Sequence, residues 1–159
     1  MNEKQYVTIL KDSLEKKVKV LKEIEQLNIE QQKNLEENEV DLEAWEANTD
    51  AKGQQIEELN LLDTGFEELY EKVRVPLSEQ KELYREEIKS MQKLIARITE
   101  LSVNIKVQEQ RNKDLAMRQF GRMRKQIKTV KQSKRVAKLY DTSMKKLNYV
   151  DAQFMDKKN

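Results

Sequence analysis

Apolar residues recur along most of the chain at alternating spacings of three and four, which is the spacing of one face of an α-helix. Three segments carry this pattern, and we expect helices over about residues 2–36, 39–74 and 77–147. Their lengths and the short segments between them predict an all-α fold, an elongated antiparallel three-helix bundle with coiled-coil-like seams. We expect one helical domain over residues 1–148, followed by a flexible tail over residues 149–159.

The expected helix boundaries rest on capping and turn residues. Asn2 can cap the first helix, and Gln5 three residues later can complete a capping box. Asn38 is the candidate cap of the second helix, because the acidic run around it suits the positive end of a helix dipole. Pro76 favours a tight turn before the third helix, since proline lacks a backbone N–H. A single helix kinked at Pro76 is the alternative.

The second helix has the most regular seam of the three. Most of its seam positions are apolar, but Thr49, Lys52 and Asp63 are polar. We expect the Lys52 side chain to extend along the seam so that its ammonium group reaches water. The seam positions are Leu42, Trp45, Thr49, Lys52, Ile56, Leu59, Asp63, Phe66, Tyr70, Val73 and Leu77.

The stripe of the third helix changes character halfway along. From Tyr84 to Ile105 it is almost entirely apolar and can close a core, whereas Glu109 and Asn112 would need polar partners if they were buried. The first two helices should each be roughly 50 Å long at 1.5 Å per residue. We therefore expect the bundle to end near Arg111, with the rest of the third helix forming an overhanging or frayed arm.

The charge changes sign at the same place. The formal net charge is +2, yet residues 1–110 carry a net −9, while residues 111–146 hold 13 lysines and arginines against two aspartates. Such a basic arm can bind nucleic acid, an anionic membrane or an acidic protein surface, or it can fold back on the chain's own acidic bundle. We do not expect nucleic acid as a partner, because no nucleic-acid-binding fold is recognisable and aromatic residues are sparse.

The composition excludes several classes of function. The chain has no His and no Cys, which removes the usual nucleophile–base pairs and the commonest metal ligands. The acidic residues between 36 and 41 are interpreted as a solvated turn. No run approaches the roughly 18 apolar residues of a membrane span, and no signal-peptide core follows the first residues. We expect a cytoplasmic protein that is not an enzyme and has no metal, cofactor or small-molecule substrate.

The basic arm also carries a discontinuous apolar ribbon. An amphipathic helix of another protein could dock on it, and methionine adapts its shape to a partner surface. The sequence leaves the oligomeric state open, because Trp45, the seam of the second helix and the basic arm could each support a homodimer. The ribbon consists of Met117, Phe120, Met123, Ile127 and Val130.

Two runs of the third helix carry a family resemblance. Residues 91–101 (MQKLIARITEL) and 108–115 (QEQRNKDL) resemble the third-helix segment of FlgN-type flagellar export chaperones. The order of Trp45, Lys52 and Phe66 on the second helix also fits. The resemblance covers roughly residues 5–145. FliT-type chaperones share this helical style, and these runs do not separate the two families.

The resemblance implies a cytosolic chaperone of the flagellar type III export system. Such chaperones bind the C-terminal helical segments of hook-associated proteins, which form the hook–filament junction, and deliver them to the export gate. The implied client contacts are Asn112, Leu115, Phe120, Met123, Ile127 and Val130. A tyrosine beyond them contacts the export gate in some members, and both Tyr140 and Tyr149 are candidates. Competing interpretations are binding of nucleic acid or anionic surfaces through the basic arm, and a structural coiled-coil role.

Overall fold

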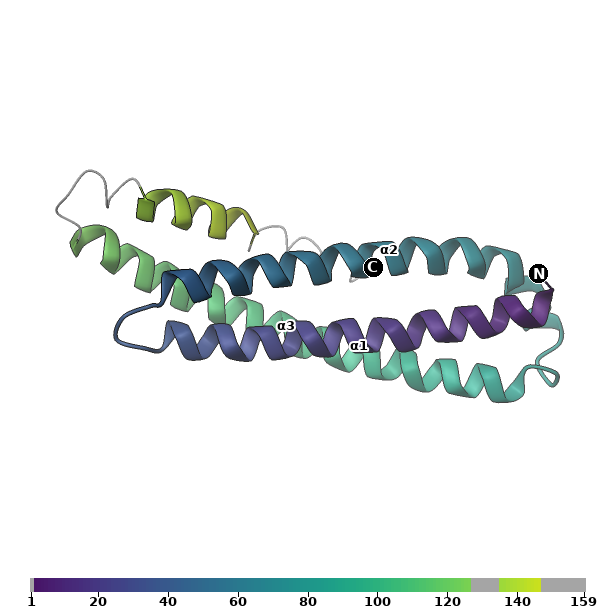
Figure 1. Cartoon of the computed structure of the whole chain (residues 1–159). Helices are drawn as coiled ribbons and strands as arrows, with labels where there is room; N and C mark the ends of the chain where they lie inside the picture. The colour runs from purple at the N-terminus through teal and green to yellow at the C-terminus, as the bar shows by residue number, and fades with distance from the viewer. Residues whose placement is uncertain (1, 127–134, 147–159) are drawn as a thin grey trace.

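The computed structural model describes residues 2–126 and 135–146. Three long helices, α1 (Glu3–Leu35), α2 (Leu42–Glu79) and α3 (Arg85–Gln126), run in alternating directions and form an elongated bundle (Figure 1). α1 packs closely along both α2 and α3, whose backbones approach each other less closely. The predicted all-α bundle is confirmed.

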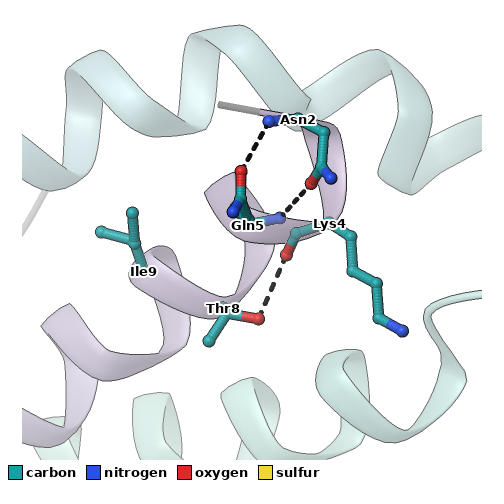
Figure 2. A pocket seen from close by; sticks show the side chains of 5 residues that line it. All are labelled: Asn2, Lys4, Gln5, Thr8 and Ile9. Atoms are coloured by element: carbon teal, nitrogen blue, oxygen red, sulfur yellow. Dashed lines mark hydrogen bonds between the residues drawn. The ribbon is translucent and has the colours of Figure 1, made fainter.

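α1 begins as the sequence predicts. The Asn2 side-chain oxygen accepts a hydrogen bond from the Gln5 backbone N–H at 2.9 Å, and the Gln5 side-chain oxygen accepts one from the Asn2 N–H at 2.8 Å (Figure 2). This reciprocal capping box satisfies two backbone donors that have no partner inside the helix.

α2 begins later than predicted. Asp41 is its N-cap instead of Asn38, and the Asp41 carboxylate accepts a hydrogen bond from the Ala44 N–H at 3.1 Å. The reason lies at the end of α1, where the Asn34 side chain bonds both the N–H and the C=O of Asp41 at 2.9 Å. These two hydrogen bonds keep the chain in the turn as far as Asp41, so the predicted helix start at residue 39 is wrong.

α2 also continues through the predicted turn. Pro76 lies inside the helix, which ends at Glu79, and the chain then reverses direction before α3. The predicted hairpin therefore forms, but after Glu79 instead of at Pro76, and the alternative of a single kinked helix is wrong. Val73 is fully buried and Leu77 packs against the same apolar cluster, so core contacts on both sides of Pro76 support the helix there. Consequently α3 begins at Arg85 rather than at residue 77.

Three apolar clusters follow one another along the bundle. The first contains Val7, Leu10, Leu14, Val73, Tyr84 and Met91. The second contains Val20, Leu21, Ile24, Ile56, Leu59, Leu101 and Ile105. The third contains Leu35, Val40, Trp45, Ala116 and Phe120. Because the third cluster includes Ala116 and Phe120, the expectation that the core ends near Arg111 is wrong.

A buried polar layer separates the second and third clusters and explains why the core continues. Lys52 of α2 and Glu109 of α3 form an ion pair at 2.8 Å, with both side chains only 2% exposed. Asn112 donates hydrogen bonds to the Asn28 backbone oxygen at 2.9 Å and to the Gln31 side chain at 3.1 Å. The polar positions of α3 thus find partners on α1 and α2, and Lys52 ends inside the bundle rather than in water.

Part of the predicted arm returns to the bundle. α3 extends past the turn between α1 and α2, as the predicted overhang requires (Figure 1). Residues 135–146 form a separate helix, here called the returning helix, which lies beside the first turns of α2 instead of continuing along α3. For these residues the basic arm folds back on the acidic bundle. The predicted tail over residues 149–159 lies outside the described residues.

Tyr84 joins the start of α3 to the start of α1. Its hydroxyl donates a hydrogen bond of 2.5 Å to the Glu3 carboxylate. This hydrogen bond, followed by burial and the negative charges of Glu3 and Glu87, raises the pKa of Tyr84 to about 12. The phenol therefore stays protonated in the folded chain at a pH where a free tyrosine ionises.

A pH dependence of stability follows from Tyr84. The unfolded chain releases this proton at about pH 10 and the folded chain at about pH 12, so its contribution is complete below pH 10 and is lost between the two values. We expect the free energy of unfolding to fall more steeply over this window in the native chain than in Tyr84→Phe. Urea denaturation followed by circular dichroism measures it, with the exposed Tyr70→Phe as control. Equal slopes for the native chain and Tyr84→Phe would contradict the assignment.

Candidate functional site

An aromatic pair lies where α2 begins and α3 ends. The rings of Trp45 and Phe120 meet edge to face, with their centroids 5.2 Å apart and their planes at 71°. Both side chains are fully buried. Such a pair contributes about 0.5–1.5 kcal/mol beyond the burial of its area. Leu42, Leu115 and Met123 pack around it, and together these five residues form what we call the aromatic face.

The returning helix covers the aromatic face. The Tyr140 ring meets Phe120 edge to face, at 5.9 Å between centroids and 78° between planes. The Trp45 indole N–H donates a hydrogen bond to the Ser143 hydroxyl. The Arg124 guanidinium lies over the Tyr140 ring, 5.0 Å from its centroid. A cation in this position is attracted by the ring electrons. Tyr140, a candidate for the gate contact, is therefore half-buried within the chain.

The structure distributes the predicted client contacts over three environments. Phe120 is completely buried beneath the returning helix, and Leu115 and Met123 are half-buried at the edge of the same cluster. Asn112 is completely buried in the polar layer, bonded to α1. The structure thus brings Leu115, Phe120 and Met123 together, whereas Asn112 lies in the adjacent polar layer. Outside the described residues lie Ile127, Val130 and Tyr149.

α3 also holds the turn that precedes α2. Gln119 donates hydrogen bonds to the backbone oxygens of Leu35 at 2.7 Å and Glu37 at 3.1 Å. Arg122 donates one to the backbone oxygen of Asn38 at 2.9 Å. Carbonyls at the end of a helix lack partners inside it, and these side chains supply them. Hydrogen bonds from α3 and from the end of α1 thus hold the turn, and the turn positions Trp45 against Phe120.

Sequence reasoning missed the part that α2 plays in this site. The sequence predicts Trp45 at the seam of the second helix, with a homodimer contact as one possibility, whereas the structure shows it fully buried against Phe120 and Ser143 of the same chain. One signal was available, since Trp45 is the sole tryptophan of the chain and lies at the regular seam. Its contact with Phe120, 75 positions later in the chain, depends on the register of α2 against α3, which the sequence does not give.

Besides the aromatic face, two hollows open on the surface of the described residues. One, beside the start of α1, is lined by Asn2, Lys4, Gln5, Thr8 and Ile9 (Figure 2). The Asn2 and Gln5 groups there are already used by the capping box. The other is a cavity of about 210 Å³ between α2 and the returning helix, lined mainly by polar and charged side chains. Its lining is Glu46, Thr49, Arg135, Lys138, Leu139, Thr142, Ser143 and Lys146.

Neither a metal site nor a membrane span is found among the described residues. Across residues 2–126 and 135–146, no three acidic side chains are grouped so that they could hold a metal ion. Within the same ranges, none of the helices has both the length and the apolar character needed to cross a membrane. The candidate site is therefore the aromatic face.

The sequence profile of the FlgN family, described as FlgN protein, matches residues 1–147. The chain belongs to the FlgN family. The match spans α1, α2, α3 and the returning helix, so it covers everything that the structure describes. It favours FlgN over the FliT-type alternative that the sequence runs left open. FlgN is a family of flagellar export chaperones and not of enzymes. Comparisons with curated proteins and with solved structures gave no match.

The FlgN match gives the aromatic face a context. The face lies in the region of α3 where the resemblance places the client contacts, and α2 completes it with Trp45. A chaperone that holds a helical client needs apolar surface at a defined place on an otherwise charged molecule. In this FlgN-family chain the surface exists, and the chain's own returning helix lies on it.

Proposed function

We propose that this FlgN-family chain is a cytoplasmic chaperone that binds C-terminal helical segments of hook-associated proteins and delivers them to the flagellar type III export gate. The observation that carries the proposal is the aromatic face, which concentrates Trp45 and Phe120 at the basic end of a family-matched α3. Aromatic and methionine side chains are the usual anchors for a helix that docks in a groove.

The proposed client contacts have different roles at this face. Phe120 forms the floor with Trp45, and Leu115 and Met123 form the half-buried edge that a client side chain reaches first. Asn112 supports the floor through its hydrogen bonds to α1 and would not touch the client directly. Ile127 and Val130, outside the described residues, would extend the contact as the helical spacing predicts.

The client proposal is tested at the edge of the face. We expect Met123→Asp to weaken binding of a hook-associated protein by at least tenfold, about 1.4 kcal/mol, because a carboxylate would lose its hydration on docking. Co-purification and calorimetry with the hook-associated proteins of the same bacterium measure this effect. Val103→Asp is the matched control, because Val103 is 59% exposed on α3 outside the cluster. Equal binding by both variants, or no binding by the native chain, would refute the proposal.

The proposed gate contact rests on the family resemblance. Tyr140 and Tyr149 remain the two candidates, and Tyr140 is partly engaged with Phe120 and Arg124 within the chain. A pull-down with the cytoplasmic part of the export gate, comparing Tyr140→Ala with Tyr149→Ala, would decide between them. If neither variant weakens the interaction, the gate contact lies elsewhere.

A further inference from the structure

The returning helix occupies the aromatic face in the manner of a docked amphipathic helix. Val136 and Ser143 are almost completely buried, while Tyr140 and Met144 pack against the third apolar cluster. These positions are separated by four, three and one, so they form one face of the helix. The same face that would receive a client thus already holds a helix.

The returning helix is short, and its ion pair with α2 is partly open to solvent. It has 12 described residues, a length at which an isolated helix is marginal in water. The side chains of the Lys146–Asp50 ion pair are 33% and 56% exposed, and ion pairs in contact with solvent contribute about 0–1 kcal/mol. A hollow of about 210 Å³ lies between the helix and α2, beside Glu46 and Thr49. A segment held in this way can leave without unfolding the bundle.

Charge complementarity indicates which helix the face accepts. Glu46 and Asp50 form an acidic edge on α2, and the returning helix places Arg135, Lys138 and Lys146 along that edge. Opposite the acidic edge, Arg124 of α3 lies over the ring of Tyr140. The preferred occupant is therefore an amphipathic helix with an apolar ridge that contains an aromatic residue, and with basic residues toward α2.

We propose that the aromatic face seats one amphipathic helix at a time, that the returning helix occupies it in the free chaperone, and that the client helix replaces the returning helix. The inference rests on the proposed function for the identity of the client. It predicts that the client enters with an aromatic residue over Phe120 and basic residues facing Asp50. It also predicts that the apparent affinity is reduced by the fraction of molecules in which the face is covered.

A reversible crosslink tests the replacement on the full chain. The protein has no cysteine, so Asp50→Cys with Lys146→Cys gives two unique thiols at a contact between α2 and the returning helix. A bifunctional, reducible thiol reagent then holds the helix in place. We expect closure to weaken binding of a hook-associated protein by at least tenfold, and reduction to restore it. Lys17→Cys with Asp63→Cys is the matched control, since that pair joins α1 to α2 at 2.6 Å away from the face.

A second measurement needs no client. Hydrogen exchange followed by mass spectrometry should show amides of residues 135–146 exchanging at least about 100-fold faster than those around Ile24 in the buried core of α1. Exchange as slow as in α1 would overturn the inference, because the returning helix would then leave only when the bundle unfolds. Fast exchange supports it.

The outcomes separate the two proposals. If closed and reduced crosslinked chains bind the client equally well, the replacement is refuted and the proposed client function stands. If no form of the chain binds any hook-associated protein, the proposed function is refuted, and the exchange rates still decide whether the aromatic face opens. Loss of binding on closure, with restoration on reduction and no effect of the control crosslink, supports both.

Discussion

Replacing Lys52 with alanine is expected to lower the free energy of unfolding by about 3–5 kcal/mol, because it leaves a buried carboxylate without its counter-charge. Lys52 and Glu109 are each only 2% exposed and lie 2.8 Å apart, so water cannot take the place of the ammonium group without opening the bundle. Gln31 lies 3.4 Å from the same nitrogen and is too weak a partner to compensate. Urea denaturation followed by circular dichroism at 222 nm measures the change.

A double replacement distinguishes the missing charge from the missing side chain. Lys52→Met combined with Glu109→Leu removes both charges and retains most of the volume, and such replacements are often neutral or stabilising by about 1–4 kcal/mol. Arg74→Ala is the control, because the exposed Arg74–Glu71 pair should contribute less than about 1 kcal/mol. If the double variant is as unstable as Lys52→Ala, the loss comes from packing and not from the unpaired charge.

Phe120→Ala is expected to cost about 3–5 kcal/mol, the range found when a large buried aromatic side chain is truncated. Phe120 contacts Trp45 on one side and Tyr140 on the other, so its removal opens a space between α2, α3 and the returning helix. Fluorescence reports the site directly, since Trp45 is the sole tryptophan. We expect its emission to shift to longer wavelength as water reaches the indole, together with a lower midpoint of urea denaturation.

The control for Phe120 lies one turn earlier on the same helix. Met117 is 47% exposed, so Met117→Ala should change the free energy of unfolding by about 0.5 kcal/mol or less and leave the Trp45 emission unchanged. A Phe120→Ala chain with the native midpoint and native emission would show that the aromatic face contributes little to stability. It would also weaken the case for Phe120 as the floor of a client site.

The helices and most of their buried faces follow from local sequence rules. The capping box at Asn2 and Gln5 and the seam through Trp45, Ile56 and Leu59 were predicted correctly, because caps and helical periodicity depend on residues close together in the chain. The errors arose at the turns. The hydrogen bonds from Asn34 to Asp41 depend on the fold of the turn, and the continuation of α2 through Pro76 depends on the contacts of Val73 and Leu77 with the core.

The candidate site was predicted only in part. Leu115, Phe120 and Met123 were named from the ribbon and the resemblance, and they lie together at the end of α3. The sequence does not predict the other half of the face, because the expected end of the bundle near Arg111 places Phe120 on an overhanging arm, out of reach of Trp45. The sequence also does not predict that residues 135–146 fold back over the face. Apolar spacing is the same in a helix that extends away from the bundle and in one that returns to it.

The sequence by itself determined three long helices, the acidic and basic parts of the chain, and the absence of His and Cys chemistry. Only the tertiary structure decided that Lys52 and Glu109 meet inside the bundle and that residues 135–146 lie on Trp45 and Phe120. Periodicity specifies which face of a helix is buried, but not which residues of another helix lie opposite. A buried charge or amide is tolerated only when a partner stands at that position, and the register of the packed helices supplies the partner.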